Sequence, residues 1–188
     1  MKKKRGDINR SHSLLFPYTL LALGICLLTL WGTHVYFRTR SLTLNEAILA
    51  TLEQAPQHAE LPVRIHIPSI TTVDIVRAGK INGEWTISEH AANFVMQSAT
   101  PGTPGNSIIY GHNTYNIFAN LIRTKRGDRV TVYMSNGTIL TYTVVDIQEV
   151  TPDRTDLLKS TVTEVLTIYT CSGWLDSKRF VLRAVPTL

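Results

Sequence analysis

The stretch Val165-Leu166-Thr167-Ile168-Tyr169-Thr170-Cys171 organises the interpretation of the whole chain. Its first six residues are apolar or of high β propensity, so they predict a strand that ends on a thiol. Side chains alternate along a strand, which puts Cys171 on the same face as Thr167 and Tyr169. We expect this strand to deliver Cys171 to a groove on the surface of the domain.

A return strand is predicted over residues 180–185, where the even-numbered residues form an apolar face. If that face packs on the core, Arg179 lies across one loop from Cys171 on the same outer surface. A cation in this position can stabilise a thiolate or an oxyanion. The alternative is a solvated strand-end charge that pairs with Asp176.

A cysteine thiol has a pKa near 8.5, so a cysteine nucleophile needs a proton partner at neutral pH. His112 lies between Gly111 and Asn113 at the end of a predicted strand, where a loop can aim its side chain at a groove. His66 is predicted to be an exposed strand residue. His90 is predicted to lie in the first turn of a helix. His112 is therefore the candidate proton carrier.

The charge of the chain is unevenly placed. The 188 residues contain 19 Lys and Arg and 14 Asp and Glu, a formal net charge of +5. Five basic residues and one acidic residue lie in residues 1–13, whereas residues 62–188 hold twelve basic and ten acidic residues. The nearly balanced second region argues against a nucleic-acid partner.

No charged residue occurs from Ser11 to Phe37, and residues 14–37 are mostly apolar. About 20 such residues cross a membrane, so we predict a transmembrane signal anchor over 14–37. The basic tail 1–13 is expected in the cytoplasm and everything after the anchor outside the cell. A cleaved signal peptide is the alternative. Residues 38–61 are expected to form a juxtamembrane helix and linker.

The two cysteines, Cys26 and Cys171, fall in different parts of this arrangement. Cys26 lies within the predicted anchor, so it is not expected to pair with Cys171. A solitary thiol outside the cell is either buried and inert or reactive. No cysteine or histidine spacing typical of a zinc site occurs, so we expect no metal.

The outer region 62–188 is predicted to be one mainly β domain. Short strands separated by Gly, Pro and Asn turns favour an antiparallel sheet closed into a barrel or sandwich. A helix is predicted from Ser88 to Gln97, and a type I′ turn at Asn136-Gly137. The strands expected in chain order lie at 63–67, 73–77, 85–87, 107–110, 130–134, 138–147, 165–170 and 180–185.

Several segments together resemble one family. Thr167-Ile-Tyr-Thr-Cys171 resembles the Thr-Leu-x-Thr-Cys signature of sortases, the surface cysteine transpeptidases of mainly Gram-positive bacteria. The segment from Pro104 to His112 is similar to the family's histidine segment, and Gly127-Asp128 to the turn after it. Arg179 falls where the family's arginine begins the final strand. The resemblance spans about residues 62–185.

The resemblance implies an eight-stranded sortase-type β-barrel with short helices, preceded by one transmembrane helix. It implies Cys171 as nucleophile, His112 as general acid and base, and Arg179 as the residue that positions substrate and stabilises the oxyanion. Thr170, at the motif's threonine, would line the same site. Trp174, in the loop before Arg179, is a candidate wall of the substrate site, and a loop aromatic that covers the core is the alternative. Sortases need no cofactor.

The family's partners follow from the same resemblance. Sortases cleave an LPXTG-like C-terminal sorting signal of secreted proteins and hold the acyl group as a thioester. They then transfer it to an amine acceptor, a peptidoglycan precursor or a pilin lysine. The cell-wall precursor is the acceptor we expect here.

Some features of the sequence indicate which class of sortase it resembles. No Asp-Pro-aromatic lid precedes the domain, no hydrophobic segment follows Leu188, and the connection from Cys171 to Arg179 is short. We therefore expect similarity to the small D, E or F types rather than to the pilin-assembling class. An L,D-transpeptidase would carry Ser-x-Gly-Cys, which is absent. A catalytically silent sortase-like scaffold at the cell surface is the remaining alternative.

Overall fold

A computed structural model describes residues 12–40, 60–78, 80–81, 84–85 and 87–187. The chain divides into two compact units, one up to Thr39 and the other from Arg40 onward. Residues 1–11 of the predicted basic tail and residues 41–59 of the predicted juxtamembrane helix and linker lie outside the described residues.

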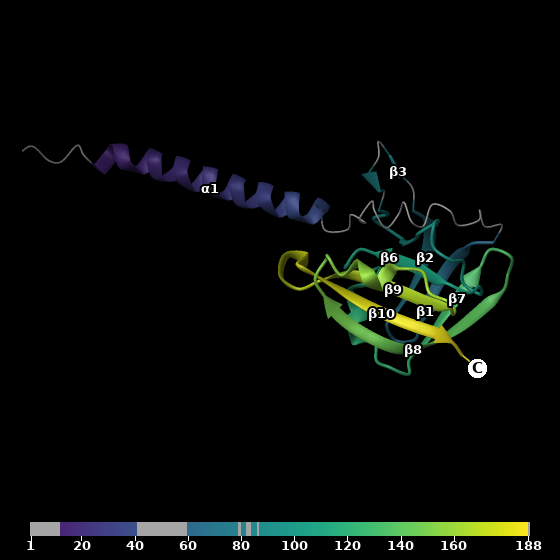
Figure 1. The fold of residues 1–188 in the computed structure, drawn as a ribbon. Helices are drawn as coiled ribbons and strands as arrows, with labels where there is room; N and C mark the ends of the chain where they lie inside the picture. Colours follow the sequence, from purple (N-terminus) through teal and green to yellow (C-terminus); the bar gives the residue numbers. More distant parts are fainter. Residues whose placement is uncertain (1–11, 41–59, 79, 82–83, 86, 188) are drawn as a thin grey trace, which may run out of the picture. The chain divides into compact units, whose positions relative to one another are not determined.

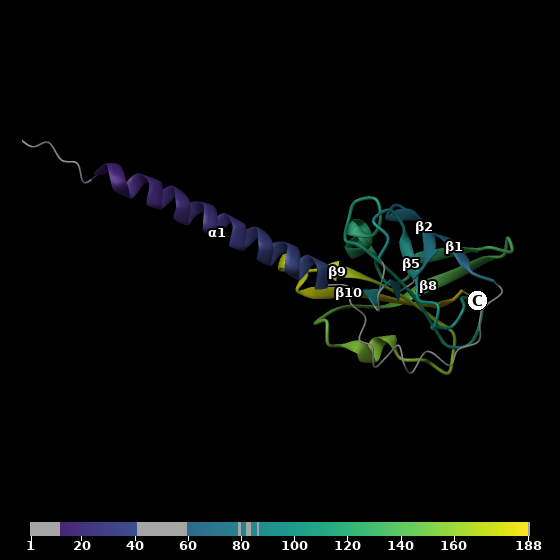
Figure 2. The same cartoon turned by 90° about the horizontal axis from the view of Figure 1, so that it is seen from above.

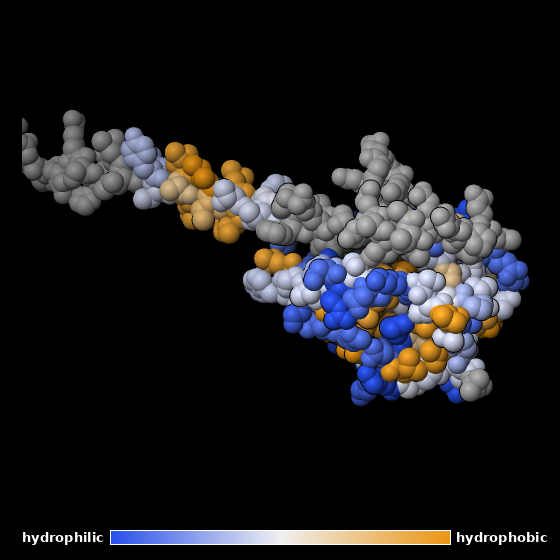
Figure 3. All heavy atoms as spheres, in the orientation of Figure 1, coloured by the Kyte–Doolittle hydropathy of each residue, from blue (hydrophilic) through white to orange (hydrophobic). Residues whose placement is uncertain are grey.

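The first unit holds helix α1 (His12–Arg40), which contains the predicted anchor. Its window Pro17–His34 has a mean hydropathy of 1.2 and is exposed, so it is a candidate membrane span by length and composition. On the face that Figure 3 shows, apolar side chains gather along the middle of this helix. The hydroxyls of Thr29 and Thr33 donate to backbone carbonyls one turn earlier, which satisfies polar groups that lipid could not.

The second unit is a closed eight-stranded barrel in the order β1-β2-β5-β6-β9-β10-β8-β7 (Figure 1), which confirms the predicted closed eight-stranded barrel. Two neighbouring pairs, β2–β5 and β6–β9, are parallel, and the other pairs are antiparallel. Strands β3 (Lys80–Ile81) and β4 (Glu84–Trp85) form a separate small sheet. The barrel strands are β1 (Pro62–Ile67), β2 (Thr71–Arg77), β5 (Ala92–Phe94), β6 (Asn106–Gly111), β7 (Arg129–Met134), β8 (Ile139–Val150), β9 (Val165–Ser172) and β10 (Lys178–Pro186).

Three short 3₁₀ helices lie in the connections of the described chain, η1 (Ala119–Arg123), η2 (Thr155–Leu158) and η3 (Trp174–Asp176). The segment with η2 joins β8 to β9, and η3 lies in the loop between β9 and β10. Figure 2 shows β9 and β10 running side by side, as their hydrogen-bonded pairing requires.

Strand β9 is buried along its whole length, on both faces. One face contributes Leu166 and Ile168 to the barrel interior. The other face contributes Tyr169 to a second apolar cluster outside the barrel. The second cluster also contains Ala78, Val95, Ile108, Tyr110, Leu157 and Val181. A strand covered on both faces reads as a continuous apolar run, which is the pattern that this segment has in the sequence.

The helix predicted from Ser88 to Gln97 is wrong. The Ser88 hydroxyl accepts hydrogen bonds from the backbone N–H groups of His90 and Ala91, as a helix cap would. The chain then enters β5, which pairs with β2 on one side and β6 on the other. Two ladders of backbone hydrogen bonds outweigh the weak helical preference of a short segment.

The hairpin around Asn136-Gly137 is confirmed, but its predicted turn type is wrong. Gly137 has φ of +88°, whereas Asn136 does not have a positive φ. The Gly137 N–H donates to the Met134 carbonyl, which is the hydrogen bond of a four-residue turn. This geometry is a turn followed by one left-handed glycine, a common alternative to the tight two-residue loop.

Candidate active site

Two of the three residues predicted to carry chemistry lie on the adjacent strands β9 and β10, and His112 directly follows the neighbouring strand β6. Strands β6 and β9 are parallel, and their last pair in register is Gly111 with Thr170. His112 and Cys171 follow at the next position of each strand. On the other side of β9, Arg179 of β10 is the direct partner of Cys171. Neighbouring strands lie about 4.8 Å apart, so the three residues form one row across the sheet.

The ring contact between Tyr110 and Tyr169 indicates on which face of the sheet the side chains of this row lie. The two rings stack with centroids 5.5 Å apart on the outer face of the barrel. His112 and Cys171 each follow two positions later, so strand alternation turns them to the same face. Burial raises the pKa of Tyr169 well above its usual value, and Arg179 and Cys171 both exert smaller electrostatic effects on that pKa. Arg179 and Cys171 therefore lie near this ring.

Cys171 is only 2% exposed, which differs from the surface groove that we expected. Tyr169, two positions earlier on the same strand face, packs in the second apolar cluster, most of whose members are distant from it in sequence. Cys171 forms no disulfide.

The backbone around His112 is held by two hydrogen bonds. The Thr170 hydroxyl donates to the Gly111 carbonyl at 2.8 Å, and the Phe118 N–H donates to the His112 carbonyl at 3.2 Å. A Cβ on Gly111 would lie 2.7 Å from Ile117 Cγ2, so only glycine lets the following turn pack this closely. Thr170 is fully buried, and its expected contact with substrate stays a prediction.

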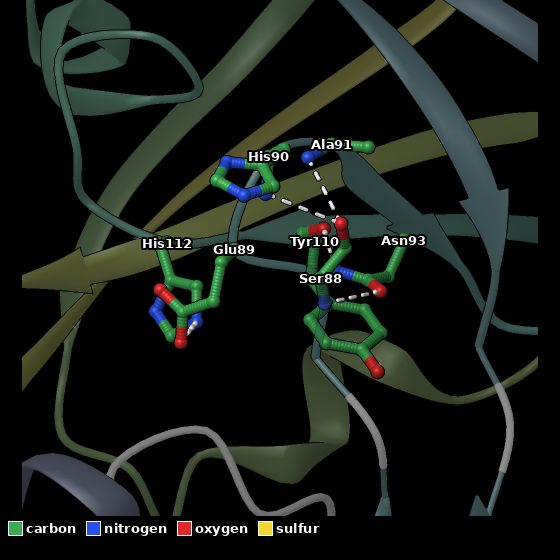
Figure 4. A network of polar contacts seen from close by, with 7 residues as sticks. All are labelled: Ser88, Glu89, His90, Ala91, Asn93, Tyr110 and His112. Carbon is green, nitrogen blue, oxygen red and sulfur yellow. Dashed lines mark hydrogen bonds and ion pairs between the residues drawn. The ribbon is translucent and has the colours of Figure 1, made fainter.

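Glu89 lies beside His112. The distance from His112 Nε2 to Glu89 Oε1 is 3.6 Å, with the histidine side chain 17% exposed and the glutamate 68% exposed. Figure 4 shows the two side chains facing each other. Glu89 belongs to a turn whose first N–H, that of Ser88, donates to the buried Asn93 side chain at 3.1 Å.

Arg179 is bound to its own loop. Its Nη1 donates to the carbonyls of Asp176 at 2.9 Å and Lys178 at 2.8 Å. Arg179 thus contacts Asp176, its partner in the predicted alternative, through the backbone carbonyl of that residue. The same loop holds Leu175 with φ of +50° and exposes 84% of Trp174. The expected contact of Trp174 with substrate stays a prediction.

Neither of the other two histidines of the domain belongs to this row. His66 Nδ1 lies 2.7 Å from the Thr72 hydroxyl across the β1–β2 pair, and His90 is exposed. Within the described parts of the chain, no group of three or more His, Cys, Asp or Glu side chains could hold a metal ion. That the site works without metal or cofactor stays a prediction.

Comparison with known proteins identifies the family. A family model described as the sortase domain matches residues 65–187. The chain belongs to the sortase family. The curated sortase A of Bacillus anthracis is 29% identical over 128 residues, and the match covers 63% of this chain. The chain spans 56% of the length of that relative.

Solved sortases share the fold. Sortase A from Corynebacterium diphtheriae aligns with a TM-score of 0.59 at 25% identity, covering 77% of this chain and 70% of the other. The sortase D5 transpeptidase of Clostridium perfringens aligns with a TM-score of 0.58 at 24% identity, covering 81% and 94%. These likenesses agree with the eight-stranded barrel order of this sortase.

Two features of the sortase site are not predicted from the sequence. Glu89 was assigned to a helix start, because Ser88 followed by an acidic residue is typical of one. The stacked Tyr110 and Tyr169 were treated as ordinary strand residues. Their spacing contained a usable signal, because each lies two positions before a candidate catalytic residue and so shares its face.

Proposed function

We propose that this sortase is a cysteine transpeptidase that cleaves an LPXTG-like sorting signal and transfers the acyl group to an amine. The row of His112, Cys171 and Arg179 across β6, β9 and β10 carries this proposal. In this row a histidine lies on one side of the thiol and an arginine on the other, which supports the roles of proton carrier and oxyanion-stabilising cation that a cysteine nucleophile requires.

In the first step the Cys171 thiolate attacks the carbonyl carbon of the sorting-signal threonine. Arg179 stabilises the negative oxygen of the tetrahedral intermediate. The bond from that carbon to the following nitrogen breaks, His112 gives a proton to the leaving amine, and a thioester remains on Cys171.

In the second step an acceptor amine attacks the thioester carbonyl. The amine loses a proton to His112, the carbon–sulfur bond breaks, and a new amide leaves as Cys171 is regenerated. The thioester retains the acyl-transfer energy of the first step, so no external energy source is needed. A cell-wall precursor is the acceptor that we propose, with a pilin lysine as the other candidate.

The proposed location follows from α1 and the charge of residues 1–13. Residues 14–37 anchor the chain as a single pass, with the basic tail in the cytoplasm. Residues 38–61 connect the anchor to the catalytic domain, residues 62–188, which lies outside the cell. There it meets secreted proteins that carry C-terminal sorting signals.

One observation favours a second candidate function. The burial of Cys171 fits a catalytically silent barrel that binds partners at the cell surface. The two candidates differ in whether a thioester forms on Cys171, which can be measured directly.

The experiment uses the full chain in detergent with a panel of fluorogenic sorting peptides. We expect cleavage, an acyl-enzyme adduct on Cys171 in intact mass spectra, and faster turnover when an amine is added. Cys171→Ala should abolish cleavage and adduct, whereas Cys26→Ala, the same change at the other cysteine, should keep both. Unchanged cleavage by Cys171→Ala removes this thiol from the mechanism. Absence of cleavage and adduct across the panel favours the silent barrel.

A further inference from the structure

The turn before β5 holds Glu89 in a defined place. The Ser88 hydroxyl accepts hydrogen bonds from His90 N–H at 3.2 Å and Ala91 N–H at 3.1 Å. The Ser88 N–H in turn donates to Asn93 Oδ1. A turn with these bonds at both ends has few backbone conformations left.

This turn is tied directly to the strand that ends at His112. Asn93 is 1% exposed, and its Nδ2 donates to the Tyr110 carbonyl at 3.4 Å. Strands β5 and β6 are antiparallel with Asn93 opposite Tyr110. Continued by two residues, the same register brings Ala91 opposite His112. Glu89 therefore reaches His112 from a segment fastened to β6, as Figure 4 shows.

We propose that Glu89 is a positioning residue for His112. The Glu89 carboxylate holds the imidazole by Nε2 and stabilises its protonated form during acyl transfer. The inference rests on the proposed function, because it assigns His112 the proton of both steps. At 3.6 Å the contact is an ion pair and is longer than a hydrogen bond. With Nε2 turned to Glu89, the reaction's proton is exchanged through Nδ1.

A solvated surface charge is the competing explanation for Glu89, because its side chain is mostly exposed. Exposed ion pairs are weak and sensitive to salt. The bonded turn and the low exposure of His112 favour a positioning role, and the expected effect is correspondingly modest. The two explanations predict different values of kcat for Glu89→Gln, a different dependence of that kcat on salt, and a different recovery of kcat in Glu89→Asp.

The kinetic experiment compares Glu89→Gln and Glu89→Asp with the parent full chain in detergent. Glu89→Gln should lower kcat by about three- to fivefold, the range that one exposed charge pair supports, with KM within about twofold. Glu89→Asp should recover part of the loss, because the charge remains on a shorter side chain. In 1 M NaCl the ratio of parent to Glu89→Gln should approach one, because the Debye length falls to about 3 Å.

The matched control is Glu60→Gln, the same change at an exposed glutamate just before β1. Strand β1 begins at the barrel end where β6 also begins, away from His112. This variant should behave as the parent. An unchanged kcat for Glu89→Gln, or a loss that appears in KM and persists in Glu89→Asp, overturns the proposal.

A second measurement does not depend on activity. Melting temperatures of Glu89→Gln, His112→Asn and the double variant form a cycle at pH 5.5, where an imidazole is charged. We expect a coupling of about 1–3 °C that disappears in 1 M NaCl. Zero coupling at low salt overturns the ion pair even if peptides are cleaved. Coupling in a protein that cleaves no peptide would instead leave the pair intact and reject the transpeptidase function.

Discussion

The parallel strands β6 and β9 begin and finish in different surroundings. Where they begin, Asn106 donates to the carbonyls of Leu157 at 3.1 Å and Lys159 at 3.0 Å, and accepts from the Thr167 hydroxyl at 2.6 Å. Asn106 and Thr167 are both buried. These bonds fasten the η2 segment to the two strands and satisfy polar groups that burial would otherwise penalise.

Where the same strands finish, the polar side chains are arranged for chemistry. His112 faces an exposed carboxylate, and Arg179 donates hydrogen bonds to the backbone carbonyls of Asp176 and Lys178. Two successive residues of that loop, Leu175 and Asp176, have positive φ, which costs a non-glycine residue free energy. About 17 Å of strand thus separates an end that stabilises the fold from an end that stores strain beside reactive groups.

The largest effect that should separate the two ends is on catalysis. Arg179→Gln should lower kcat/KM for a sorting peptide by about 10²–10³, the usual loss of one oxyanion donor. The melting temperature should stay within about 2 °C, because the lost hydrogen bonds lie in a partly exposed loop.

The control is Lys178→Gln, which removes the neighbouring cation and its ion pair with Glu149 at 3.1 Å. Lys178→Gln should keep most activity, since exposed pairs contribute little. Equal losses in the two variants would mean that general positive charge, rather than the guanidinium opposite Cys171, supports the reaction.

The next effect is on stability and belongs to the opposite end. Asn106→Ala should cost about 2–3 kcal/mol of unfolding free energy, because it leaves buried carbonyls and a hydroxyl unpaired. That loss corresponds to a fall of about 4–12 °C in melting temperature. The kcat measured well below melting should change little.

Thr167→Val sharpens this result, because it removes the hydroxyl that donates to Asn106 while conserving shape. The double variant should cost less than the two single changes together, since they share one hydrogen bond. Additive losses, or a large loss of kcat in Asn106→Ala at low temperature, would contradict the division between the ends.

Much of the fold was predictable because local patterns agreed with the tertiary structure. The apolar face expected for residues 180–185 packs in the barrel interior, as Phe180, Leu182 and Ala184 show. Strand alternation also predicted that Cys171 and Arg179 share a face, and the register pairs them directly. Both inferences needed only the two-residue period of a strand.

The missed features depend on distant segments. Tyr169 of β9 packs in an outer cluster with Leu157 and Val95, whose positions no local pattern reveals. Residues 92–94 form a strand because β2 and β6 lie on either side, whereas their own sequence also suits a helix. Glu89 could be associated with His112 only after β5 and β6 were known to pair.

The smallest expected effect tests the backbone strain in the loop between β9 and β10. Leu175→Gly should raise the free energy of unfolding by about 0.5–1 kcal/mol, because glycine adopts φ of +50° without steric cost but loses more entropy on folding. The melting temperature should rise by about 1–4 °C. Leu175→Ala is the matched control, because it removes the same side chain but retains the strained Cβ. Calorimetry of the two variants decides the point. If Leu175→Gly melts no higher than Leu175→Ala, the loop beside Arg179 stores no strain, and the two ends differ in chemistry alone.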